Sequence, residues 1–151
     1  MNASIHDFHD DARNADILIW VNGELKSRAE ATVSVFDSGF VLGDGVWEGF
    51  RVMAGHPVFL EAHLDRLFEG AKAIAMDIGM SRAELREAVY ATLKANGMRD
   101  GVHVRLMLTR GVKRTPYQDP RTCIGKATLV IIPEYKLPKP ETVNAGLSLF
   151  T

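Results

Sequence analysis

This sequence of 151 residues has little cysteine, almost no net charge and no long apolar run. Cys123 is the single cysteine, so no internal disulfide can form, and we expect a structural thiol in a reducing compartment. The 18 basic residues nearly balance the 19 acidic ones, which argues against nucleic-acid binding. No apolar run reaches the length of a membrane span, and the polar residues 1–16 do not resemble a targeting signal. We therefore expect a cytoplasmic protein with neither a nucleic-acid nor a membrane partner.

Familiar signatures of catalytic and metal sites are also absent. The histidines and acids show no metal-ligand spacing, so we expect no metal site. The sequence has no Ser-His-Asp order, and the GDG at 43–45 lacks the further glycine pattern and the lysine of a phosphate-binding loop. Any chemistry must therefore come from other residues.

Strands are predicted in the first third of the chain. Residues 1–16 show no period, so we expect a mobile arm there. In 17–25, ILIWVNGEL, the apolar run is broken by Asn-Gly, the strongest short-range hairpin signal. A short strand is expected at 31–36, ATVSVF, and a longer one begins within GDGVWEGFRV at 43–52. The glycines at 43 and 45 let the chain turn there and pass close to other backbone.

Two amphipathic helices are predicted next. From Glu61, apolar residues at three- and four-residue spacing form one helical stripe, namely Leu64, Leu67, Phe68, Ala71, Ile74 and Ala75. A second helix begins with the capping box Ser81-Arg82-Ala83-Glu84 and ends at Asn96-Gly97. Its buried side is expected to consist of Leu85, Val89, Thr92 and Leu93.

Two strong strands follow the helices. In 102–109, VHVRLMLT, the even-numbered residues face the core, whereas His103, Arg105 and Met107 face the other way. A further strand is predicted at 127–132, after a long loop at 110–126 of the kind that is either functional or disordered. Because alternating βαβ units are absent, we expect an α+β fold, a mainly antiparallel sheet with two helices packed on it.

The last residues allow two interpretations. After the proline-containing residues 137–142, the run AGLSLFT at 145–151 begins to alternate like a strand. It is either the last strand of the sheet or the start of a part whose other half lies outside this chain, because an unpaired edge strand invites aggregation.

His63 and Arg66 are the first candidate binding residues. They lie three apart in the first helix, at the border of its apolar stripe. A guanidinium in such a place can grip a phosphate, although the same spacing also fits a solvated surface arginine.

Further basic residues lie on the strand at 102–109 and in the loop after it. His103 and Arg105 share one strand face, which is either a polar face in water or the lining of a pocket that binds a carboxylate. Arg110 and Arg114 can do the same from the loop, or can be ordinary surface residues.

The motifs taken together resemble the class IV aminotransferases. They are V-N-G-E at 21–24, D-S-G-F-V-L-G-D-G-V-W-E-G-F-R-V at 37–52, H-L-D-R-L at 63–67 and a strand ending in T-R-G. These pyridoxal-phosphate (PLP) enzymes include branched-chain and D-amino-acid aminotransferases, (R)-selective amine transaminases and aminodeoxychorismate lyase. The resemblance covers nearly all of 17–151, and G-D-G-V-aromatic-E-G followed by H-L-x-R-L is far rarer than either motif alone.

The resemblance implies roles for individual residues. Arg66 matches the arginine that holds the cofactor phosphate. Trp47 matches an aromatic position of the substrate pocket. Leu42 matches a position that reaches the neighbouring subunit's pocket in some members, which implies a homodimer.

The resemblance also implies a carboxylate site and a missing part. His103 and Arg105 match strand residues that approach the substrate carboxylate, with Arg114 as the alternative. The family's catalytic lysine matches none of the seven lysines, so no catalytic residue is expected in this chain. Residues 17–136 then correspond to an N-terminal domain, and 137–151 to a linker and first strand leading into a C-terminal domain.

The expected function is therefore that of part of an enzyme. With its missing lysine supplied by a C-terminal domain or a second chain, it would move an amino group between a small-molecule amino donor and a 2-oxo acid. The chain alone is expected to be inactive. An aminodeoxychorismate lyase-like activity and a non-catalytic binding module are the alternatives.

Overall fold

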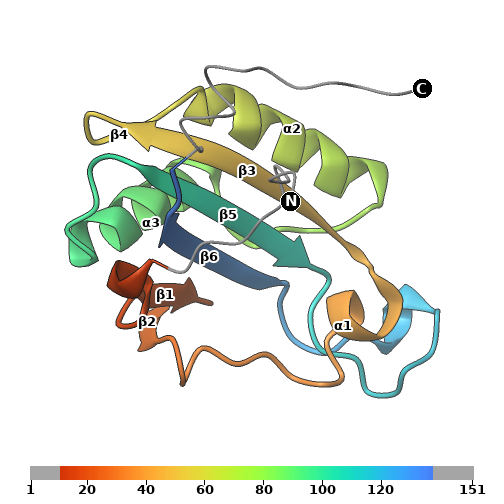
Figure 1. Ribbon diagram of the computed structural model, residues 1–151. Coiled ribbons are helices and arrows are strands. Elements are labelled where there is room, and N and C mark those ends of the chain that lie inside the picture. Colours follow the sequence, from red (N-terminus) through yellow and green to blue (C-terminus); the bar gives the residue numbers. More distant parts are fainter. Residues whose placement is uncertain (1–10, 138–151) are drawn as a thin grey trace, which may run out of the picture.

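A six-stranded antiparallel sheet forms the centre of the protein, which we describe from a computed structural model over residues 11–137 (Figure 1). The strand order is β2-β1-β6-β5-β3-β4. The strands are β1 (Leu18–Val21), β2 (Glu24–Ser27), β3 (Gly45–Met53), β4 (His56–Pro57), β5 (Val102–Thr109) and β6 (Thr128–Tyr135). All their pairings are antiparallel, so the predicted α+β class with a mainly antiparallel sheet is confirmed.

Two long helices cover one face of the sheet (Figure 1). They are α2 (Leu60–Ala73) and α3 (Arg82–Ala95), and both were predicted. A third, short helix, α1 (Ser38–Leu42), lies before β3 and was not predicted, because five residues are too few to show a helical period. None of the helices within the described residues is long and apolar enough to cross a membrane.

The core lies between this face and the helices. The predicted alternation of β5 is confirmed, because Val102, Val104, Leu106 and Leu108 are fully buried while Arg105 and Met107 are exposed. The predicted buried side of α3 is also confirmed, with Leu85, Val89, Thr92 and Leu93 all buried. The opposite face of the central strands therefore carries exposed side chains that can meet a ligand.

The predicted turn and cap chemistry is present. Asn22 and Gly23 join β1 to β2 with positive φ angles of 50° and 102°, as a two-residue hairpin turn requires. The capping box at Ser81 is complete, since its side chain accepts from the amide of Glu84 and the Glu84 side chain accepts from the amide of Ser81. These local signals fix where β2 and α3 begin.

The strand predicted at 31–36 is wrong. Residues 31–34 have no regular structure and 35–36 form a turn, with Val33 and Val35 exposed. Both edges of β1 are already paired, one with β2 and the other with β6, so β1 cannot accept this segment as a further strand. The segment does not pair with the free outer edge of β2 either, so its β-propensity is not expressed as a strand.

The mobile arm predicted for 1–16 does not extend to residues 11–16. A 3-10 helix at Ala12–Asn14 lies against β6, where the Asn14 side chain donates to the carbonyl of Tyr135 and accepts from its amide. Residues 1–10 lie outside the described residues, as does the strand expected at 145–151.

The long loop at 110–126 has more structure than predicted. It contains a 3-10 helix at Pro120–Thr122 and two isolated bridges. Lys113 is 2% exposed, and its ammonium donates to the carbonyl of Asp119 and lies 3.6 Å from the sulfur of Cys123. A buried polar side chain with internal partners holds the loop in place.

Candidate functional site

Helix α2 runs antiparallel along the start of β3, and the two elements meet at regular intervals. Val46 contacts Gly70, where an added Cβ would lie 3.2 Å from a Val46 methyl carbon. Glu48 binds Arg66 and His63, and the ring of Phe50 lies 5.3 Å from that of His63. Two strand residues span about 6.6 Å and four helix residues about 6 Å, so the contacts repeat with nearly matched spacing.

Glu48 is the centre of a three-residue cluster. Its carboxylate accepts from Nε of Arg66 at 2.6 Å and from Nη2 at 2.5 Å, and it lies 2.7 Å from Nδ1 of His63. The Glu48 side chain is 4% exposed, whereas that of Arg66 is 69% exposed. The cluster therefore has a buried acid that holds an exposed cation.

The electrostatics of the cluster keep both partners charged. Burial raises the pKa of Glu48, but the hydrogen bonds from Arg66 and His63 outweigh it, so the net pKa lies below its ordinary value. The same pair raises the pKa of Arg66. Within residues 11–137, Nη1 of Arg66 has no hydrogen-bond partner. That edge of the guanidinium can donate to an external anion such as a phosphate.

A second cluster lies on the opposite face of β3. Trp47 follows the pleat away from α2, and the guanidinium carbon of Arg105 lies 4.5 Å from the centre of its ring. This distance is typical of a cation–π contact. Because Trp47 and Glu48 are neighbours in one strand, the two clusters flank the same stretch of β3.

His103 joins this second cluster through a glycine. An added Cβ at Gly49 would lie 3.1 Å from Nε2 of His103 and 3.6 Å from the Trp47 ring. The glycine thus leaves room for the imidazole to lie across β3 beside the indole. Burial and the nearby charge of Arg51 lower the pKa of His103, so its imidazole is neutral at pH 7 in the absence of an anion.

The structure brings together only part of the predicted site. Trp47, His103 and Arg105 form one contiguous patch, and Arg66 lies on the other side of β3. Leu42 is 40% exposed at the end of α1. Within residues 11–137, no hydrogen bond or ion pair links the exposed Arg114 to the patch.

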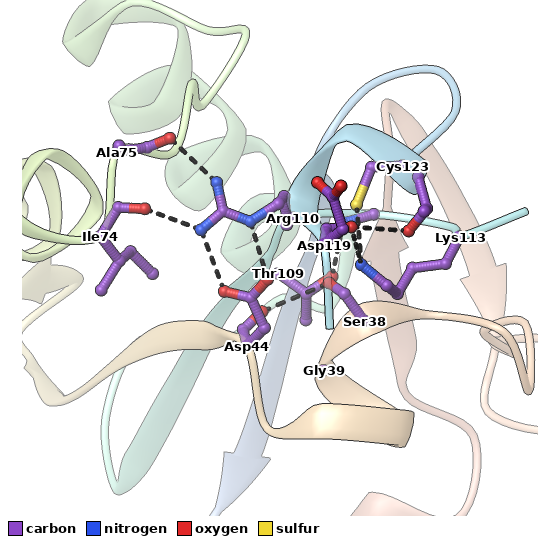
Figure 2. Close-up of polar contacts among 12 residues, drawn as sticks. Ser38, Gly39, Asp44, Ile74, Ala75, Thr109, Arg110, Lys113, Asp119 and Cys123 are labelled. Atoms are coloured by element: carbon purple, nitrogen blue, oxygen red, sulfur yellow. Dashed lines mark hydrogen bonds and ion pairs between the residues drawn. The ribbon is translucent and has the colours of Figure 1, made fainter. Parts of the chain in front are cut away.

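Two features of the site were not assigned from the sequence. The role of Glu48 could have been inferred from strand alternation, which places it on the same buried face as Phe50 and Val52. A buried acid needs a cation as its partner. The pairing of Asp44 with Arg110 joins residues 66 positions apart, and no sequence spacing indicates it (Figure 2).

The glycines at positions 43 and 45, where the chain enters β3, have the predicted effect. Gly43 ends α1 in the left-handed conformation with φ of 68°, and a Cβ at Gly45 would lie 2.5 Å from the carbonyl oxygen of Leu108. Only glycine allows this close approach of β3 to β5. The tight start of β3 then places Trp47 and Glu48 among its first four residues.

A family model and several curated relatives match this chain. A model of the family described as Amino-transferase class IV matches residues 45–150. Branched-chain-amino-acid aminotransferase-like protein 1 of Arabidopsis thaliana is 48% identical over 125 residues. The match covers 83% of this chain and 22% of that protein.

Solved structures share the fold. A branched-chain amino acid aminotransferase from T.th., complexed with N-(5'-phosphopyridoxyl)-L-glutamate, has a TM-score of 0.67 and 28% identity over 77% of this chain and 40% of that one. The 4-amino-4-deoxychorismate lyase from Pseudomonas aeruginosa has a TM-score of 0.65 and 34% identity over 83% and 42%. This chain therefore spans less than half the length of each of these relatives.

Proposed function

Because the chain belongs to the class IV aminotransferases, we propose that it is the N-terminal part of a PLP-dependent enzyme that moves an amino group between an amino acid or amine and a 2-oxo acid. One observation carries the proposal most directly. Adjacent residues of β3, Trp47 and Glu48, serve two clusters on opposite sides of the strand, one with an exposed guanidinium and one with an aromatic floor. The first suits a phosphate and the second an organic carboxylate.

The residues present fit the phosphate of PLP. Arg66 offers a charged, exposed donor edge, and the buried Glu48 fixes the tilt of its guanidinium by two parallel hydrogen bonds. When bound, the cofactor supplies a ring that stabilises negative charge on a substrate carbon. Arg66 holds the phosphate end so that the ring keeps one orientation while substrates exchange.

The patch on the other face is proposed to bind the substrate. Arg105 meets the carboxylate of the amino acid or 2-oxo acid, and an N–H of His103 donates a hydrogen bond to the same carboxylate. Trp47 forms the wall against which the substrate side chain packs. Leu42 and Arg114 are proposed to complete a pocket from other parts of the assembly, with Arg114 the alternative carboxylate ligand.

Other parts of the enzyme are proposed to lie outside this chain. The lysine that carries the cofactor and transfers the proton is assigned to a C-terminal domain or a second chain, with residues 137–151 leading towards it. We propose a homodimer, supported by the exposed apolar side chains of Val33, Val35, Phe40 and Leu42. The cytoplasmic location stays a prediction of the sequence.

Amino exchange by the complete protein tests the proposed function. The protein is incubated with PLP, an amino donor and a 2-oxo acid, and the new amino acid and new 2-oxo acid are quantified. Their formation in equal amounts supports the aminotransferase. A second candidate is favoured by the likeness to the Pseudomonas aeruginosa lyase, and pyruvate released from aminodeoxychorismate without amino exchange would establish it instead. If the complete protein does not bind PLP, a non-catalytic binding module becomes the remaining interpretation.

A further inference from the structure

We propose that Arg110 is a positioning residue for the phosphate grip, because it anchors the C-terminal end of α2 to the turn before β3 and so sets where Arg66 lies. The inference rests on the proposed function, since it concerns the binding of the PLP phosphate. Arg110 itself is assigned no contact with the cofactor or the substrate.

Arg110 joins three segments that are distant in sequence (Figure 2). Its Nε donates to Oδ2 of Asp44 at 2.7 Å and its Nη2 to Oδ1 at 3.1 Å. Nη2 also donates to the carbonyl of Ile74 at 2.7 Å, and Nη1 to the carbonyl of Ala75 at 2.9 Å. One guanidinium thus connects the GDG turn, the end of α2 and the start of the loop after β5.

The end of α2 needs this support. Ala75 has φ of 50°, in the left-handed region where a helix normally ends with glycine. The amide of Met76 donates to the carbonyl of Ala71 and closes the helix, while the carbonyls of Ile74 and Ala75 point to Arg110. A cation at a helix C-terminus also interacts favourably with the helix dipole. Arg110 therefore stabilises an ending that an alanine adopts at a cost.

The anchor is the first of a series of contacts that leads to Arg66. Asp44, Val46 and Glu48 occupy alternate positions on the same side of the chain entering β3. Asp44 is linked through Arg110 to the carbonyls of residues 74–75, just after α2. Val46 then meets Gly70, and Glu48 binds Arg66. Arg66 lies about two helical turns before the anchored end. Because a helix of this length moves as a rigid unit, releasing its end shifts the guanidinium against Glu48.

Most of the donor capacity of Arg110 is used by internal partners, because four of its five N–H groups donate within residues 11–137. Its side chain is 16% exposed, and each of its three guanidinium nitrogens already donates to Asp44, Ile74 or Ala75. The hydrogen bond with Asp44 raises the pKa of Arg110, so the guanidinium is charged at neutral pH. Its influence on the phosphate is exerted through α2.

Affinity for PLP and for pyridoxal, which lacks the phosphate, tests this role in the complete protein. In Arg110→Ala we expect the dissociation constant of PLP to rise about fivefold or more, and that of pyridoxal to change by less than about twofold. Arg110→Lys keeps the charge but not the fork, so it should recover only part of the affinity. Arg121→Ala is the matched control, because Arg121 pairs bidentately with Asp119 in the same loop without touching α2.

Amide exchange measured by mass spectrometry provides a second readout that is independent of activity. Peptides at the end of α2 should exchange about fivefold faster in Arg110→Ala and in Asp44→Asn, but not in Arg121→Ala. If wild-type protein binds PLP and the Arg110 variants bind it equally well, this inference is overturned and the proposed function stands. Equal losses of affinity for PLP and for pyridoxal would also overturn this inference alone. Wild-type protein that does not bind PLP overturns the proposed function, and the inference with it.

Discussion

Glu48 and Arg66 are joined by two parallel hydrogen bonds, from Nε to Oε1 at 2.6 Å and from Nη2 to Oε2 at 2.5 Å. The Glu48 carboxylate is buried between β3 and α2, and the Arg66 guanidinium is largely exposed. Paired bonds of this kind fix the plane of the guanidinium as well as its position. The buried partner therefore sets the direction in which the exposed partner offers its remaining donors.

Replacing the buried acid should weaken folding as well as orientation. In Glu48→Gln we expect the free energy of unfolding at neutral pH to fall by about 1–3 kcal/mol, because a charge-assisted pair is lost in a buried place. Urea unfolding of wild type and variant measures the difference. A variant as stable as the wild type would show that the pair contributes nothing to the fold.

The Glu48 pair also predicts a pH dependence. The folded pKa of Glu48 lies below the ordinary 4.5, so its stabilisation is fully present above that value and is lost as pH falls through the folded pKa. The stability difference between wild type and Glu48→Gln should therefore shrink between neutral pH and about pH 3. A difference that stays constant over this range would contradict the assigned pKa.

The fold was largely predictable because its signals are local. The Asn22-Gly23 turn, the Ser81 capping box and the alternation of 102–109 each act over a few residues, and each holds in the structure. The strand expected at 31–36 failed for a non-local reason, since both edges of β1 are paired and the segment does not join the free outer edge of β2. Propensity without a partner strand does not make a strand.

The imidazole of His103 should report on an anion bound beside Arg105. Its pKa lies below the ordinary 6.5 through burial and the charge of Arg51, and a bound carboxylate should raise it. We expect the His103 resonances in an NMR titration to shift to a higher midpoint with a 2-oxo acid and not with its methyl ester. Equal titration curves with both compounds would remove His103 from the carboxylate site.

The same depressed pKa sets the sign of a stability effect. As pH falls below 6.5, the unfolded chain takes up the proton first, so wild type loses stability down to the folded pKa. His103→Gln should lack this part of the pH dependence. Unfolding curves of both proteins between about pH 7 and pH 5 measure it, and parallel curves would contradict the prediction.

Gly49 tests whether the two clusters act separately. In Gly49→Ala the new methyl would lie 3.1 Å from the His103 ring and displace it. We expect the KM for the 2-oxo acid to rise about threefold or more while the affinity for PLP stays unchanged, because Arg66 lies across the strand. A matching loss of PLP affinity would show that the clusters are not independent.

Arg105 and Arg114 compete for the same proposed role. Arg105 is held against Trp47, so Arg105→Ala should raise the KM for the 2-oxo acid about tenfold or more. Arg114→Ala should change it by less than about threefold, because Arg114 has no hydrogen bond or ion pair to the patch within residues 11–137. Steady-state kinetics of both variants measure the two KM values. A larger increase in KM for Arg114→Ala than for Arg105→Ala would assign carboxylate binding to the loop.

The arrangement of the site was less predictable than its residues. The motifs identified four site residues, namely Arg66, Trp47, His103 and Arg105. The side of β3 on which each lies depends on the pleat of the strand and on how α2 packs against the sheet. The partner of Arg66 is 18 residues away in sequence, and that of Arg110 is 66 away. Ion pairs of such separation are set by tertiary packing and have no periodic signature.

The proposal that Arg66 binds the cofactor phosphate is tested by the affinity of the complete protein for PLP, measured in wild type, Arg66→Ala and Arg86→Ala. Arg86 is the matched control, an exposed helix arginine whose partner is Glu61 on α2. We expect PLP affinity to fall about tenfold or more in Arg66→Ala and not to change in Arg86→Ala, with pyridoxal affinity unaffected by either substitution. Unchanged PLP affinity in Arg66→Ala would contradict it and leave Arg66 as an ordinary surface arginine.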